Sequence, residues 1–278
     1  MGESPTTALR QKKDASITVA LRQVKDGHAD AVVAAGSTGA AMAAALMTLG
    51  RIPGIERPAI AVVLPTQQGP TVLLDVGANV DAKPTYLHQF AIMGSVYFRA
   101  VFKSDRPRVG LFNIGEEETK GNDLTLKVYP LLKATPQLNF IGNVEGRDLP
   151  AGKADVVVCD GFIGNGLLKF AEGMALLLMD MMKTEIARDW RGKLGALFMK
   201  NNLRALKRRL DYSEYGGAPL LGVNGLCIIG HGSSKANGIF HAIRVAKEAT
   251  EGRVIAIIRE ELAASKPAPE AAAPEQGA

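Results

Sequence analysis

Short runs of β-branched and other apolar residues alternate along the chain with longer stretches of helical periodicity. This alternation is typical of α/β folds, in which a mixed or parallel sheet is sandwiched by helices. The pattern predicts strands at Ala31–Ala35, Ala59–Leu64, Thr71–Asp75, Val109–Ile114, Leu138–Ile141, Ala154–Asp160 and Gly225–Ile229. It predicts helices at Ile17–Asp26, Ala40–Leu49, Thr85–Phe102, Leu124–Leu132, Leu167–Ile186 and Asn237–Ala263.

The short polar segment Pro65–Pro70 separates the second and third of these strands, and it predicts a hairpin. The sheet is therefore expected to be largely parallel but mixed. A chain of 278 residues that is 47% hydrophobic has enough apolar material for a substantial core. We expect one α/β catalytic domain over residues 1–264 and a disordered tail over 265–278, which is rich in Pro, Ala and Glu.

The net charge of +5 is concentrated in one segment. Residues 183–209 hold nine basic and two acidic residues, whereas the remainder of the chain holds 24 basic and 26 acidic residues. A positive patch of this kind indicates an anionic partner. The segment has few aromatic residues on which bases could stack, which argues against nucleic acid.

The same region, residues 183–210, predicts an amphipathic basic helical hairpin. Apolar residues recur at helical spacing in it, namely Trp190, Leu194, Leu197 and Phe198. Such a helix can lie on an anionic membrane surface with its apolar stripe inserted. Alternatively, the stripe packs against the core or a second subunit, as most amphipathic helices do.

Only two cysteines occur, Cys159 and Cys227, each inside an apolar run. A disulfide framework and a thiolate metal site are therefore not expected, and a reducing cytoplasm is the natural compartment. Cys159 is expected to be an inert core thiol rather than a nucleophile. The N-terminus lacks the basic and then apolar segments of a signal peptide. We also expect no apolar run long enough to span a membrane.

Loops that follow predicted strands carry small and polar residues, which suits anion binding because backbone N–H groups are exposed there. Neither a dinucleotide fingerprint nor a P-loop occurs. The residues of interest in these loops are Gly36, Ser37, Thr38 and Gly39; Asn79 and Asp81; Lys120; Asn165; and His231, Gly232 and Ser233.

Several motifs occur in a characteristic order across nearly the whole chain. They include Ala-Gly-Ser-Thr-Gly-Ala, Leu-Asp-Val-Gly-Ala-Asn-Val-Asp, Asn-Ile-Gly-Glu-Glu with Lys-Gly following, Cys-Asp-Gly-Phe-Ile-Gly-Asn and His-Gly-Ser-Ser. Together they resemble the PlsX family of acyl-[acyl-carrier-protein]:phosphate acyltransferases. The resemblance implies a fold related to isopropylmalate dehydrogenase and phosphotransacetylase, a homodimer, and peripheral association with the inner membrane face.

The resemblance also implies the reaction, in which inorganic phosphate takes a fatty acyl group from the thioester of acyl-carrier protein to give acyl phosphate. No cofactor is expected, and no metal-ligating residues are identified. Lys120 and Asn165 match the positions tied to catalysis. Phosphate is already an anionic nucleophile, so the site needs binding groups and oxyanion donors rather than a strong base. We expect Lys120 to hold phosphate and the Asn165 amide to donate to the carbonyl oxygen or to phosphate.

The glycine turns at Gly36–Gly39 and Gly230–Ser234 are expected to supply further anion donors. His231 is either a general acid for the departing thiolate or a capping or backbone-bonded histidine. Two features depart from the family pattern. Ser37 stands where the family usually has Asn, and a further strand–helix unit with a glycine-rich loop normally precedes the region at which this chain begins.

Other readings remain open. One alternative is a phosphate acyltransferase of the same fold group that uses acyl-coenzyme A in place of the acyl-carrier protein. An NAD-linked decarboxylating dehydrogenase is disfavoured, because its metal-binding aspartates and arginine cluster are not found. A further alternative is a binding role without catalysis. In this hypothesis an inactive short chain binds the carrier protein or the membrane through residues 183–209.

Overall fold

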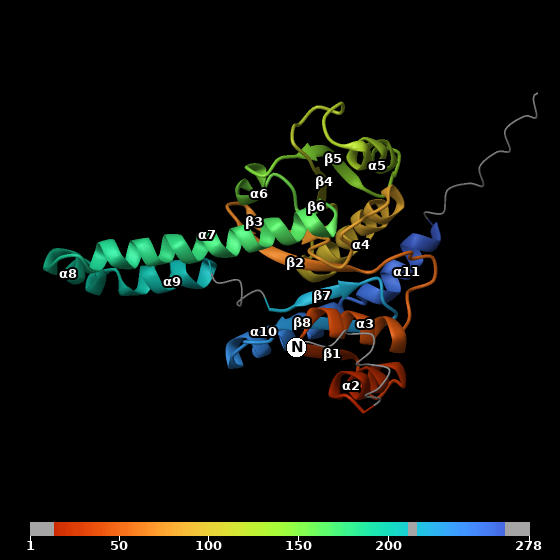
Figure 1. The fold of residues 1–278 in the computed structure, drawn as a ribbon, viewed down its shortest axis with the longest axis horizontal. Coiled ribbons are helices and arrows are strands. Elements are labelled where there is room, and N and C mark those ends of the chain that lie inside the picture. The colour runs from red at the N-terminus through yellow and green to blue at the C-terminus, as the bar shows by residue number, and fades with distance from the viewer. Residues whose placement is uncertain (1–13, 211–215, 265–278) are drawn as a thin grey trace, which may run out of the picture.

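The computed structural model describes residues 14–210 and 216–264, without the side chains of residues 207–210. The tail predicted over 265–278 lies outside the described residues. One eight-stranded sheet runs through the structure in the order β1-β8-β7-β2-β3-β6-β4-β5 (Figure 1). Its strands are β1 (Ala31–Gly36), β2 (Ala59–Thr66), β3 (Gly69–Leu74), β4 (Arg108–Phe112), β5 (Asn139–Val144), β6 (Val156–Val158), β7 (Ala218–Leu221) and β8 (Leu226–His231).

The sheet is mixed, as predicted. β3, β6, β4 and β5 form one parallel group, and β1 and β8 form another. β2 and β7 join the two groups through antiparallel pairings, so the groups run in opposite directions. The predicted hairpin of β2 and β3 is confirmed by a register that pairs Thr66 with Gly69. β7 was not predicted, because it has only four residues and they include Pro219.

Helices cover both faces of the sheet. They are α2 (Ser16–Lys25), α3 (Thr38–Thr48), α4 (Pro84–Phe102), α5 (Asp123–Lys133), α6 (Asp148–Ala151), α7 (Gly161–Ala187), α8 (Trp190–Phe198), α9 (Lys200–Leu210), α10 (Ala236–Glu251) and α11 (Val254–Ala264). Alternate strand residues serve two separate cores. Leu74 packs beneath α4, whereas Leu73 belongs to the cluster that includes residues of α2 and α3. The predicted helical sandwich is confirmed.

The single helix predicted over Asn237–Ala263 is wrong in one respect. The chain turns after Gly252, and Arg253 adopts a left-handed conformation with φ of 52°. Gly252 packs so closely on α4 that an added Cβ would lie 3.0 Å from the Cβ of Ala100. The turn divides the stretch into α10 and α11 and lays α11 against α4.

The helical hairpin is the most extended part of the fold. Figure 1 shows α7 projecting beyond the sheet, α8 at its far end and α9 returning beside it. α7 is the one helix in the described part of the chain that is long and apolar enough, by length and composition, to cross a membrane. The expectation that no such run exists was therefore wrong. Only 6% of that apolar window is buried.

Candidate active site

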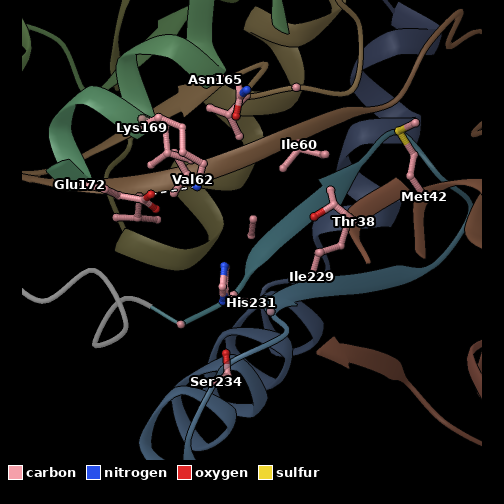
Figure 2. A pocket seen from close by; sticks show the side chains of 18 of the residues that line it. Thr38, Met42, Ile60, Val62, Asn165, Lys169, Glu172, Ile229, His231 and Ser234 are labelled. Carbon is pink, nitrogen blue, oxygen red and sulfur yellow. Dashed lines mark hydrogen bonds and ion pairs between the residues drawn. The ribbon is translucent and has the colours of Figure 1, made fainter. Parts of the chain in front are cut away.

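A cavity of about 380 Å³ lies over β2, β7 and β8, between α3 and α7. Its floor is apolar and includes Ile60 and Val62 of β2 and Ile229 of β8. Asn165 and His231 lie on opposite sides of it, as Figure 2 shows. An apolar floor with a few polar groups at the wall is typical of a site for a small molecule with an aliphatic part.

Two of the predicted glycine loops meet at one wall of the cavity. β1 and β8 are parallel neighbours, and their register pairs Gly36 with His231. An added Cβ on Gly232 would lie 3.8 Å from the Cα of Gly36, so the two turns are adjacent. Ser37 caps α3, because its hydroxyl accepts a hydrogen bond from Ala40 N–H at 3.4 Å. The N-terminus of α3 therefore faces the cavity, with Thr38 and Gly39 in its lining.

The ring of His231 is oriented by its own loop. Its Nδ1 accepts a hydrogen bond from the Ser233 backbone N–H at 3.2 Å and lies 2.6 Å from the Ser233 hydroxyl. Because a backbone N–H can only donate, Nδ1 is an acceptor, and the neutral ring carries its proton on Nε2. This geometry fits the interpretation of His231 as a backbone-bonded histidine, and in this tautomer the ring offers an Nε2–H donor.

Asn165 is positioned by the tight junction between α7 and the loop after β3. Asp160 caps α7 by accepting from Ile163 N–H at 2.9 Å. A Cβ on Gly164 would lie 1.9 Å from the backbone oxygen of Asp75, so only glycine fits there. The Asn165 side chain lies 3.7 Å from the Cβ position of Gly77. The catalytic candidate therefore sits on a helix end held directly against the loop.

Asp75 organises this loop from the interior. Its carboxylate accepts hydrogen bonds from the backbone N–H groups of Ile60, Ala78 and Asn79 and from the Asn79 side-chain amide. Burial raises the pKa of Asp75 above its ordinary value, and these hydrogen bonds lower it only in part. The Asn79 amide also donates to the Pro58 backbone oxygen at 2.8 Å. Asn79 thus supports the loop and is not among the described residues that line the cavity.

Asp81 is exposed and lies in a different cleft. That cleft, of about 460 Å³, is lined by Val80, Leu124, Phe162 and neighbouring residues. The structure therefore does not bring Asp81 together with Asn165 in the described lining of the first cavity.

Lys120 lies on the exposed loop between β4 and α5 and is also absent from the described lining of the cavity. The loop is held firmly. The Asn113 amide donates to the Lys120 backbone oxygen at 2.9 Å, and the Asn143 amide donates to the Glu117 backbone oxygen at 2.8 Å. The structure thus fixes the backbone of Lys120. The residues that follow it, Gly121 and Asn122, line a second cleft together with Asp160 and Ile163 at the start of α7.

Both cysteines are buried. Burial raises the pKa of the Cys159 thiol well above its ordinary value, and it raises the pKa of Cys227 to about 12. A thiol held neutral in this way is a poor nucleophile. The structure confirms that Cys159 lies in the core, and the raised pKa agrees with the prediction of an inert thiol. Within residues 14–210 and 216–264, His, Cys, Asp and Glu side chains form no group of three or more that could hold a metal ion.

The apolar residues expected to contact a membrane or partner lie at the far end of the hairpin, on α8. Trp190 is 70% exposed and Phe198 81% exposed, and Leu194 and Leu197 are exposed beside them. They are remote from the cavity along α7, so the structure separates this surface from the candidate active site (Figure 1).

Sequence reasoning missed two charged residues of the cavity, Lys169 and Glu172. They follow Asn165 at intervals of four and three residues, which places all three on one face of α7. The spacing alone does not show that this face meets a cavity, because a lysine and a glutamate three residues apart on a helix usually form a solvated pair.

Comparison with known proteins assigns the family. A family model described as fatty acid synthesis protein matches residues 1–257. The phosphate acyltransferase of Thermosynechococcus vestitus is 59% identical over 256 residues, covering 91% of this chain and 74% of the relative. That of Heliobacterium modesticaldum is 60% identical over 262 residues, covering 94% and 78%.

Solved structures support the predicted relation of the fold to phosphotransacetylases. EutD phosphotransacetylase from Staphylococcus aureus superposes with a TM-score of 0.56 at 14% identity, covering 90% of this chain and 74% of that one. A phosphotransacetylase from Streptococcus pyogenes gives 0.55 at 19% identity, covering 86% and 67%. The chain belongs to the fatty acid synthesis protein family, whose relatives in T. vestitus and H. modesticaldum are phosphate acyltransferases.

Proposed function

We propose that this protein transfers a fatty acyl group from the thioester of acyl-carrier protein to inorganic phosphate and releases acyl phosphate. One observation carries the proposal. An apolar floor, two adjacent glycine turns with a helix N-terminus and the Asn165 amide converge on a single cavity. The floor suits an acyl chain, and the turns suit an anion.

The chemistry needs no covalent enzyme intermediate. An oxygen of hydrogen phosphate attacks the thioester carbonyl carbon, a C–O bond forms, and the C–S bond breaks. The thiolate leaves with the bonding electrons and takes up the proton that hydrogen phosphate loses, so the products are acyl phosphate and the carrier thiol. The Asn165 amide donates to the carbonyl oxygen as negative charge develops on it. The Nε2–H of His231 is a donor available to the departing sulfur.

The activity is tested by trapping acyl phosphate as the hydroxamate after incubation with acyl-carrier protein and phosphate. Asn165→Ala is expected to lower kcat by about 100-fold, as is usual when an oxyanion donor is removed. Lys120→Ala is expected to raise the KM for phosphate if Lys120 holds that ion. Lys127→Ala removes an exposed lysine of α5, paired with Asp123, and serves as the matched control.

Each alternative predicts a different result. Hydroxamate formed from acyl-coenzyme A but not from acyl-carrier protein would assign the carrier-independent reaction. No hydroxamate from either donor, with retained binding of carrier protein or vesicles, would assign the binding role alone. Unchanged activity in Lys120→Ala would remove that residue from the mechanism.

We further propose a homodimer. Alternating steps of four and three residues place Ile163, Leu167, Phe170, Met174 and Leu177 on one side of α7, and Met181 continues the series. This is the spacing of a coiled-coil seam, which requires a partner helix. Phe170 is 69% exposed in the single chain, so the seam is open to a second copy.

Peripheral attachment to the cytoplasmic face of the membrane completes the proposal. The apolar tip on α8 adjoins the basic residues of the hairpin, a combination suited to an anionic lipid surface. The product carries an aliphatic chain that partitions into lipid, so an acyltransferase at the surface would release it where it dissolves.

A further inference from the structure

One face of α7 carries a charged pair into the candidate active site. Lys169 and Glu172 line the cavity together with Asn165, and Figure 2 shows the three side chains along the same helix. Lys169 Nζ donates to Glu172 Oε2 at 2.9 Å. Among the described residues of the lining, Lys169 is the one lysine or arginine. The cavity thus has one fixed cation, one helical turn from the amide of Asn165.

Glu172 is the less exposed partner of the pair. Its side chain is 21% exposed, compared with 58% for Lys169. A carboxylate can accept about four hydrogen bonds, and Lys169 donates one of them. An additional donor is therefore expected to satisfy Glu172 when the cavity is occupied.

A carboxylate beside the cation determines which anions fit. A fully ionised oxyanion offers Glu172 only acceptor oxygens and like charge, which is unfavourable. Inorganic phosphate near neutral pH keeps at least one P–OH group, and this group can donate to a carboxylate. Sulfate has the same tetrahedral shape but no hydroxyl at this pH. Sites with a fixed hydrogen-bonding group reject analogues that cannot pair with it.

We propose that Lys169 and Glu172 form the phosphate subsite, in which the Lys169 ammonium binds an anionic oxygen and Glu172 accepts a hydrogen bond from the P–OH group. Glu172 thereby selects hydrogen phosphate against sulfate. This inference rests on the proposed function and deepens it. Lys169 lies about 6 Å along the helix axis from Asn165, given a rise of 1.5 Å per residue. A phosphate bound there lies beside the amide that meets the thioester carbonyl.

The test measures sulfate as a competitive inhibitor against phosphate in the hydroxamate assay. The wild-type enzyme is expected to bind sulfate at least tenfold more weakly than phosphate. In Glu172→Gln the carboxylate becomes an amide, which can donate to sulfate, so sulfate inhibition should strengthen at least tenfold while the KM for phosphate rises. Lys169→Gln should raise the KM for phosphate at least tenfold and leave the KM for acyl-carrier protein unchanged.

A matched control is Glu251→Gln, which removes the same charge from a helical pair with Lys247 on the exposed surface of α10. It should change neither sulfate inhibition nor the KM for phosphate. If Glu172→Gln behaves like Glu251→Gln, the pair is a surface ion pair and the proposal is overturned.

Direct binding separates this inference from the proposed function. Calorimetric titration of the full chain with inorganic phosphate and with sulfate needs no acyl donor. Preference for phosphate that disappears in Glu172→Gln supports the subsite, even if no acyl phosphate is formed. Equal affinity of the wild-type chain for both anions overturns it. Thermal unfolding of each variant identifies any that fail to fold, and Glu172→Asp, which keeps the charge, should then retain the preference.

Discussion

Gly164 shows how one residue ties the active-site helix to the core. Its missing side chain lets α7 approach the backbone oxygen of Asp75 so closely that a Cβ would stand 1.9 Å away. Contacts below 3.0 Å are not tolerated, so any side chain at this position must displace the helix by about an ångström or more. Because Asn165 is the next residue, the displacement reaches directly the amide that we propose to be catalytic.

We therefore expect Gly164→Ala to lower kcat by tenfold to 100-fold, since misplacement by about 1 Å has this effect on positioned groups. The melting temperature should fall as well, because the close contact is overpacked. Steady-state kinetics and calorimetry measure the two effects.

Gly166 provides the comparison. It lies on the same turn of α7, but an added Cβ would meet nothing within 4 Å. Gly166→Ala should leave activity intact and raise stability by up to about 1 kcal/mol through better helix propensity. Loss of activity in both variants alike would show that helix composition, rather than the contact with Asp75, governs the site.

At the scale of elements, Arg108 and Asp155 join the beginnings of β4 and β6. The guanidinium donates to both carboxylate oxygens, at 2.8 and 3.1 Å, and the Arg108 backbone N–H donates to Asp155 at 2.7 Å. Desolvation raises the pKa of Asp155, but the hydrogen bonds from Arg108 outweigh it, and the pKa is lowered overall from 3.8. These strands lead to the loop of Lys120 and to α7, so the pair fixes the framework of both.

Asp155→Asn should reduce the free energy of unfolding at pH 7 by about 1 to 2 kcal/mol, allowing for partial exposure of the pair. A carboxyl group whose pKa is lowered by folding stabilises the protein above its unfolded pKa, and this contribution is lost as the pH falls through the folded pKa. The difference between wild type and variant should therefore shrink below about pH 4. Urea unfolding across this range measures it, and a constant difference would contradict the electrostatic account.

The seam on α7 makes the second prediction at this scale. Charged residues in place of Phe170 and Leu177 would bring carboxylates into a helix interface, which is strongly unfavourable. The double variant Phe170→Glu with Leu177→Glu should sediment as a monomer under conditions in which the wild type is a dimer. Ile243→Glu alters an exposed apolar residue of α10 and should leave the sedimentation coefficient unchanged. A wild-type monomer at micromolar concentration would refute the seam.

At the scale of the whole molecule, the helical hairpin places the exposed apolar residues of α8 far from the candidate active site near the start of α7. The pair Trp190→Ser and Phe198→Ser should weaken flotation with vesicles containing anionic lipid at least tenfold, because two inserted aromatic side chains are lost. Binding of the wild type should also decrease with salt, since lysines and arginines adjoin the tip. Phe240→Ser changes another exposed aromatic residue, on α10, and is the control. Unchanged flotation, with loss of the dimer or of the fold, would show that the tip packs against protein.

Much of this architecture could be predicted from local pattern. The segment Pro65–Pro70 indicated the hairpin of β2 and β3. The helix predicted from Thr85 begins at Pro84, in the first turn, where proline is favoured. The opposite direction of the two parallel groups could not be predicted. It depends on β7, whose four residues gain their strand conformation from neighbours far away in the sequence.

The site was predictable to a different extent. The glycine turns and Asn165 were recognisable because small residues after strands have a local signature. Lys169 and Glu172 have none, since helical spacing alone does not tell which face of α7 meets a cavity. Lys120 shows the converse limit. Its loop was correctly placed after β4, but the local sequence did not show that its side chain would be absent from the described lining of the cavity beside Asn165.

The projecting helix is also a lever. With 27 residues, α7 is about 40 Å long, and in the single chain its buried residues among those described, Gly161 and Gly164, lie in its first turn. If it pivots near Gly161 as a rigid rod, a sideways movement of 4 Å at its outer end becomes a movement of roughly 0.6 Å at Asn165, by the ratio of their distances along the axis. A displacement of the tip would therefore reach the Asn165 amide at a reduced amplitude, which is on the scale to which the proposed acyl transfer is sensitive.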